Sequence, residues 1–283
     1  MKRLIVNGDD FGYSREVNAG IIRAHREGIL TSTSLMVAEA ARDEAAALAK
    51  ENPALDVGLH LVVCMGRSVL PAAEIAPVVD ALGRFGNNAV LSGMKYFFTP
   101  GIAEKLKAEC RAQIELHLKL IGYLNHLDGH LNFHVHPAIA DIVVELAHEY
   151  KVPCIRLPRE PIFTTLAISR DRTAGKLIEA VIFLTLSRRT RRMAAERGIK
   201  STDRLFGLHQ TGHVTEDYVL GVIDRLPAGL TEIYFHPAMD IGGVPPAPSS
   251  QRETEVLASA RVRDAIASRG IRLTTFGEVA GAK

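Results

Sequence analysis

A repeated alternation of helical and strand-like segments constrains the fold of this chain more than any other sequence feature. The apolar run at residues 4–6 is followed by a helical pattern over residues 14–27 and by a second strand-like run over residues 31–37. An alanine-rich amphipathic segment, residues 40–50, then leads to a β-rich run over residues 56–63. Helix and strand alternate at intervals of roughly 25 residues, which is typical of parallel α/β units. The sequence therefore predicts an α/β fold with a parallel sheet.

The pattern continues along the chain with two exceptions. Periodicity weakens over residues 64–100, where glycine and proline are frequent, and we expect an irregular insertion that forms substrate walls or a lid. Residues 170–200 carry nine Lys or Arg against three Asp or Glu, and we expect a basic, apolar helical segment there. We also predict a short strand with a turn over residues 207–212 and one helix over residues 252–269. Since no linker or low-complexity segment divides the chain, we predict a single domain over residues 1–283.

Composition excludes several classes of protein. Apolar residues make up 47% and charged residues 23%, which favours a large core over disorder, and the formal net charge of +2 gives no reason to expect a nucleic-acid partner. The three cysteines have no spacing typical of zinc sites or disulfide frameworks, so we expect a reducing, cytoplasmic setting. The longest apolar stretch, residues 177–186, contains a glutamate and is too short for a bilayer, which needs about 20 residues. We expect a soluble protein whose oligomeric state the sequence leaves open, a homodimer included.

Two adjacent carboxylates, Asp9 and Asp10, follow the first apolar run in the stretch NGDDFG. In parallel sheets and barrels, ligands and catalytic groups collect at the C-terminal ends of the strands. In one interpretation these aspartates cap a turn and accept N–H bonds at the start of the next helix. In the other, two like charges this close raise one pKa or recruit a cation. The histidines further along the chain decide between the two interpretations.

Histidines stand where later strands are expected to end. They are His60, His236 and a cluster of four within eleven residues, His126, His130, His134 and His136. Two imidazoles and one carboxylate form the ligand set of a catalytic divalent metal and leave positions open for water and substrate. One aspartate would then bind the ion while the other acts as general base, and His236 is the natural acid for the leaving group. Arg156 would either hold the base aspartate in its charged state or form a surface salt bridge.

Five motifs resemble the YdjC family of carbohydrate deacetylases. They are NGDDFG, GLHL, LDGH, RLP and FHP, and the similarity covers nearly the whole chain. The resemblance implies an α/β fold that is a distorted, incomplete (β/α) barrel, similar to that of polysaccharide deacetylases. It also implies that Asp10, His60 and His130 bind one divalent ion, zinc or magnesium. Asp9 would be the base, and His236, by its position at a strand end, would be the acid.

The chain departs from the family pattern after the LD of the LDGH motif. The family has a small residue followed by three consecutive histidines there, and Leu131 and Asn132 replace the second and third. His130 remains the matched ligand. His134 aligns with a further family histidine, which would support the metal site from outside the ligand set.

Within the family, the stretch DGHLNFHVHP and the basic segment resemble the HpnK-type branch of hopanoid biosynthesis. This resemblance implies deacetylation of an N-acetylglucosaminyl hopanoid, a sugar carried on a membrane lipid. Residues 176–193 combine a mostly apolar stretch with four arginines in five positions, so they would form a helix lying on the inner membrane face. The alternative is a buried barrel helix with a solvated basic end. A soluble chitooligosaccharide deacetylase, a non-haem iron oxygenase and a non-catalytic sugar-binding protein remain as alternative functions.

Overall fold

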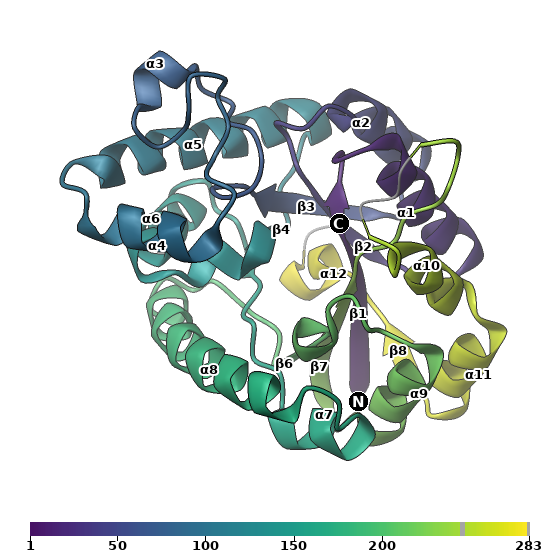
Figure 1. The fold of residues 1–283 in the computed structure, drawn as a ribbon. Helices are drawn as coiled ribbons and strands as arrows, with labels where there is room; N and C mark the ends of the chain where they lie inside the picture. The colour runs from purple at the N-terminus through teal and green to yellow at the C-terminus, as the bar shows by residue number, and fades with distance from the viewer. Residues whose placement is uncertain (244–246, 282–283) are drawn as a thin grey trace.

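A curved sheet of eight strands forms the centre of the molecule (Figure 1). The computed structural model describes residues 1–243 and 247–281, so the predicted single domain includes five residues that lie outside the described part. The strand order is β5-β4-β3-β2-β1-β7-β6, with β8 also paired to β1, and every pairing is parallel. The strands are β1 (Lys2–Phe11), β2 (Ser32–Leu35), β3 (Asp56–Leu61), β4 (His126–Gly129), β5 (Cys154–Ile155), β6 (Arg204–Phe206), β7 (Gly229–Phe235) and β8 (Ile271–Leu273).

The sheet curves into an incomplete barrel, as the sequence predicted. Its two edge strands, β5 and β6, approach each other through one isolated parallel bridge from Cys154 to Lys200, which lies just before β6. A further backbone bond runs from the amide of Leu205 to the carbonyl of Arg159. Few backbone bonds therefore close the barrel at this seam. The C-terminal ends of the strands form the mouth of the barrel.

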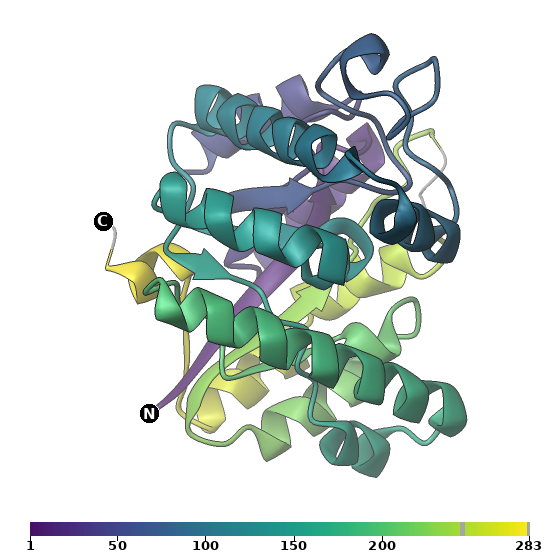
Figure 2. The same cartoon turned by 90° about the vertical axis from the view of Figure 1, so that its left-hand side faces the viewer.

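Helices surround the barrel on its outer side. Three of them, α5, α6 and α8, pack in succession along one flank (Figure 2). The helices are α1 (Arg15–Glu27), α2 (Arg42–Glu51), α3 (Ala72–Ile75), α4 (Ala89–Phe98), α5 (Ile102–Ile121), α6 (Pro137–Glu149), α7 (Ile162–Ile168), α8 (Thr173–Glu196), α9 (Glu216–Arg225), α10 (Ser250–Ala258), α11 (Ala260–Ser268) and α12 (Phe276–Ala280), with 3₁₀ turns η1 (His130–Val135) and η2 (Leu208–Gln210). Within the described ranges, no helix is both long enough and apolar enough to cross a membrane.

Three sequence-based predictions of local structure need correction. The strand expected over residues 207–212 lies earlier, at β6, and η2 follows it. The single helix expected over residues 252–269 is two helices, because Ser259 has an extended backbone and its side chain caps α11. The insertion over residues 64–100 is not irregular throughout, since its second half contains α4, whose start is capped by Asn88.

The basic segment forms α8, but it is not the buried barrel helix considered as an alternative. Val181 is 68% exposed, and Leu177, Ile178 and Ile182 are also exposed. These apolar side chains lie on the outside of the molecule, whereas Ser187 and Thr190 face inward and are fully buried. The apolar stretch predicted from the sequence is therefore a surface feature.

Candidate active site

The two adjacent aspartates lie in the last part of β1, and both face the same site. In a regular strand, neighbouring side chains point to opposite faces of the sheet. Here the pairing of β1 with β2 shifts register between Gly8 and Phe11, and Asp10 has a left-handed backbone with φ of 68°. This conformation costs a non-glycine residue roughly 1 kcal/mol. The irregularity turns both carboxylates toward the mouth of the barrel, and it replaces the turn-capping role considered for them, because Ser14 caps α1.

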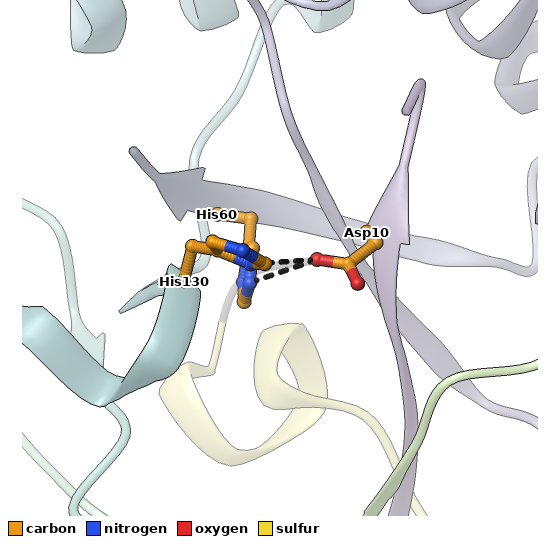
Figure 3. A group of neighbouring side chains, drawn as sticks. All are labelled: Asp10, His60 and His130. Carbon is orange, nitrogen blue, oxygen red and sulfur yellow. Dashed lines mark hydrogen bonds and ion pairs between the residues drawn. The ribbon is translucent and has the colours of Figure 1, made fainter. Parts of the chain in front are cut away.

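Asp10, His60 and His130 converge at this mouth (Figure 3). The Asp10 Oδ1 atom is 3.3 Å from His60 Nε2 and 3.1 Å from His130 Nδ1. Asp10 comes from β1, His60 from β3 and His130 from the start of η1, directly after β4. The sequence-predicted ligand set is therefore brought together by three neighbouring parts of the sheet.

Asp128 orients His60 from behind. The two residues are register partners on β4 and β3, and His60 Nδ1 lies 2.6 Å from Asp128 Oδ1. Ser34 donates a hydrogen bond to the other Asp128 oxygen at 2.7 Å. A hydrogen bond from one ring nitrogen to a carboxylate fixes the orientation of the ring, so His60 presents Nε2 to Asp10, and Nε2 is the atom that would bind a metal ion.

The donor set fits a divalent cation. One carboxylate and two imidazoles suit zinc, and Asp10 and His130 are partly exposed while His60 is buried, which leaves room for other ligands on one side. Burial lowers the pKa of His60, but the Asp128 and Asp10 carboxylates outweigh it and raise that pKa to about 10. The cluster therefore attracts positive charge to this nitrogen, whether a proton or a metal ion. Asp10, His60 and His130 are the residues that would hold the ion.

Asp9 belongs to a buried ion network centred on Arg156, which is joined to the candidate metal site through Asp128. The guanidinium donates to both Asp9 oxygens at 2.7 and 2.8 Å, and it contacts Asp128 at 2.9 Å and Glu232 at 2.7 Å. Arg156 is 1% exposed, so the surface salt bridge considered from the sequence is wrong. Asp9, His60 and Asp128 also lie close enough to share an ion, but the guanidinium already supplies the positive charge beside them.

Burial determines how the acidic members of this network titrate. It raises the pKa of Glu232 to about 7, although Arg156 acts in the opposite direction. Burial would also raise the pKa of Asp128, but Arg156 and His60 outweigh it and hold the pKa of that carboxyl well below its usual range. The carboxylates around this guanidinium are therefore not equivalent. Of Glu232 and Asp128, Glu232 takes up a proton first as the pH falls.

A pocket of about 240 Å³ joins the site to solvent. Its walls include Asp9, His60 and His130, and His236 lines it from the end of β7. The backbone amide of His236 donates to Glu253 at 2.6 Å, which fixes the chain at this point and leaves the imidazole beside Tyr234. The sequence-predicted base and acid and two of the three ligands therefore line one cavity, and the third ligand, Asp10, lies beside it in contact with His60 and His130.

The other histidines of the cluster lie outside the ligand set. His134 is buried, and its Nε2 is 2.9 Å from the carbonyl oxygen of Arg156, so it contacts the ion network through the backbone. His126 is also buried, stacked on Phe276, and its Nε2 is 3.1 Å from Ser34 Oγ. His136 caps α6.

Sequence reasoning missed four polar residues that shape the site: Asn7, Ser34, Asp128 and Glu232. Asn7 donates to Asp9 and to Ser34, so it connects β1 with β2. Asp128 had a usable signal, because it lies two residues before His130 in a predicted strand beside that of His60. Glu232 had a weaker one, a single acid within an apolar strand. Ser34 and Asn7 gave no signal, because serine and asparagine are common residue types at many positions. Their contacts follow from the order of the strands in the sheet.

The sequence profile described as "YdjC-like protein" matches residues 3–268. The chain belongs to the YdjC-like family. It is 34% identical over 98% of its length to a protein from Brevibacillus brevis named carbohydrate deacetylase, of which the alignment covers 99%. A carbohydrate deacetylase from Geobacillus stearothermophilus is 30% identical, with 97% of this chain and 96% of that protein covered. The HpnK-type branch remains a prediction.

A solved structure shows the same architecture. The crystal structure of a proposed cellobiose-phosphate cleavage protein from Enterococcus faecalis superposes with a TM-score of 0.77 at 26% identity, and the match covers 98% of both chains. The incomplete barrel described above therefore recurs along nearly the whole length of both chains.

Proposed function

We propose that this protein is a metal-dependent hydrolase that removes the acetyl group from an N-acetylated amino sugar. The observation that carries the proposal is the convergence of Asp10, His60 and His130 beside a pocket that His60, His130, Asp9 and His236 line. The full-length relatives named carbohydrate deacetylase support this reaction class.

Each polar residue of the candidate site has a role in this proposal. Asp9 acts as general base and accepts a proton from the attacking water, and Arg156 and Asn7 fix the orientation of its carboxylate. His236, which lines the same pocket from the end of β7, protonates the departing amine. A divalent cation held by the ligand set would polarise the acetamide carbonyl and make water a stronger nucleophile at neutral pH. Two imidazoles favour zinc, and magnesium is the second candidate.

The proposal extends to the form of the substrate. We infer an N-acetylglucosaminyl hopanoid, with residues 176–193 in contact with the cytoplasmic side of the inner membrane. The exposed apolar side chains of α8 and the arginines that follow them support this orientation. The alternative substrate is a soluble chitooligosaccharide, which requires no lipid contact.

The test is acetate release from an N-acetylglucosaminyl hopanoid and from diacetylchitobiose, each with and without a chelator. Chelator-sensitive release from the hopanoid alone supports the whole proposal. Release mainly from diacetylchitobiose keeps the reaction and removes the lipid assignment, and release from neither refutes the reaction class.

Variants separate the roles of the base and the ligands. Asp9→Asn should retain bound metal and lose turnover by at least a hundredfold, since general base catalysis contributes roughly 10²–10⁴. His60→Ala should lose both metal and turnover. His148→Ala, at an exposed position on α6, serves as the control and should change neither. Near-normal rates for Asp9→Asn would show that another group is the base.

A further inference from the structure

Side chains of helices α4 and α8 line an open groove that borders the candidate catalytic pocket. The groove has a volume of about 510 Å³, which lies within the range of roughly 300–1,000 Å³ found for small-molecule sites. On α4 its walls include Met94 and Phe97, and on α8 they include Ile182 and Leu186. Phe97 is 60% exposed, so much of this apolar surface is in contact with water.

The groove lies directly beside the catalytic pocket, and both are open to solvent. Leu131, Asn132 and Phe183 line both cavities and form their common wall. Leu131 and Asn132 are consecutive residues with a left-handed backbone, each with φ of 55°, directly after the metal-ligand candidate His130. Leu131 is a residue type that rarely adopts this conformation, and it places an exposed apolar side chain at the junction. A molecule that occupies the catalytic pocket can therefore extend into the groove.

The chemistry of the groove excludes a second sugar ring as its preferred occupant. Among its lining residues, polar side chains come from Asn132 and His136, and none is charged. The hydroxyl groups of a buried sugar need hydrogen-bond partners, and each unpaired group weakens binding. An alkyl or polycyclic hydrocarbon group needs none and gains from burial against Met94, Phe97 and Ile182.

We propose that this groove binds an apolar aglycone, a hydrocarbon group attached to the amino sugar whose acetamide lies in the catalytic pocket. This assignment rests on the proposed deacetylase function, because that function places the sugar beside Asp9 and His130. The groove sets preference among acetylated sugars, while the catalytic side chains on the barrel strands carry out the reaction.

The test uses monomeric N-acetyl-glucosaminides with methyl, butyl and octyl aglycones, each below its micelle concentration. For the unmodified protein, kcat/KM for acetate release should rise about fourfold for each methylene that enters the groove. Met94→Gln and Ile182→Gln, at positions 53% and 49% exposed, should lose most of this rise and keep the rate with the methyl glycoside. Leu91→Gln is the matched control, since Leu91 is 63% exposed on α4 and does not line the groove.

A second readout separates this proposal from the proposed function. Binding of octyl glucoside, which has no acetyl group, is measured by titration calorimetry for the same variants. If no glycoside releases acetate, the proposed function fails, whereas weaker octyl glucoside binding by Met94→Gln and Ile182→Gln still supports the groove. Equal dependence on chain length in all four proteins, or an equal loss in Leu91→Gln, would overturn the groove assignment.

Discussion

Replacing Arg156 with methionine tests whether the buried ion network stabilises the fold. Methionine has a similar length and no charge, so the variant Arg156→Met would leave Asp9, Asp128 and Glu232 without their shared guanidinium. Removing one partner of a buried ion pair costs about 3–5 kcal/mol, because the remaining charge has no water and no counter-ion. We expect a loss of this size in the free energy of unfolding at pH 8.

The assay is thermal and denaturant unfolding in the presence of a chelator, so that metal binding does not contribute to stability. For a chain of this length the expected loss lowers Tm by roughly 5–8 °C. The loss should be smaller at pH 5.5, because the folded variant then takes up protons on its uncompensated carboxylates. Burial already raises the pKa of Glu232 to about 7, so Glu232 should be protonated early. The folded variant then binds more protons than its unfolded chain, and its stability falls as pH rises.

Arg189→Met is the matched control for this experiment. Arg189 also contacts both oxygens of one carboxylate, at 2.9 and 2.7 Å from Asp141, but both side chains are about half exposed. Exposed pairs contribute about 0–1 kcal/mol. Similar losses for Arg156→Met and Arg189→Met, or a loss for Arg156→Met that is the same at both pH values, would refute the reasoning.

Two further predictions concern histidines. Asp128→Asn removes the negative charge next to His60 and leaves an oxygen that can still accept a hydrogen bond from the ring. We expect zinc affinity, measured by titration calorimetry, to fall ten- to a hundredfold. Unchanged affinity would show that Asp128 does not affect zinc binding by His60. Burial, with the nearby His126, lowers the pKa of His117 to about 3, so the folded protein keeps His117 neutral while the unfolded chain binds a proton below about pH 6.5. Stability should therefore decrease as pH falls from 6.5 toward 3, and His117→Gln should reduce this slope by about 1.4 kcal/mol per pH unit between pH 6 and 4. Chemical denaturation at several pH values measures the slope, and an identical slope in the variant would contradict the assignment.

The repeated strands and helices were predictable because their periodicity is local. The stretches around His60 and His130 lie on strands that the apolar pattern indicates, and the parallel arrangement then brings their ends together. The left-handed backbone of Asp10 could not be read from the sequence, because aspartate more often adopts ordinary strand geometry. The bulge depends on the pairing of β1 with β2, which is a tertiary property.

The groove between α4 and α8 also depends on tertiary contacts that local sequence does not reveal. One wall, α4, lies in a segment whose frequent glycine and proline residues led to no prediction of a helix. The sequence of the other wall, α8, is equally compatible with a buried helix and with an exposed one. Burial of an apolar helix depends on which elements cover it, and that information is not local. The sequence therefore predicts the candidate metal ligands more fully than it predicts the residues that line the groove.

The central position of β1 affects which parts of the protein open first under thermal fluctuation. β1 is hydrogen-bonded to β2, β7 and β8, so its amides exchange with solvent only when much of the sheet separates. The surface helices α4 and α8 are held by fewer contacts and can fray without disturbing that strand. Because Asp9 and Asp10 are part of β1, these two carboxylates should keep their relative positions until the molecule unfolds globally.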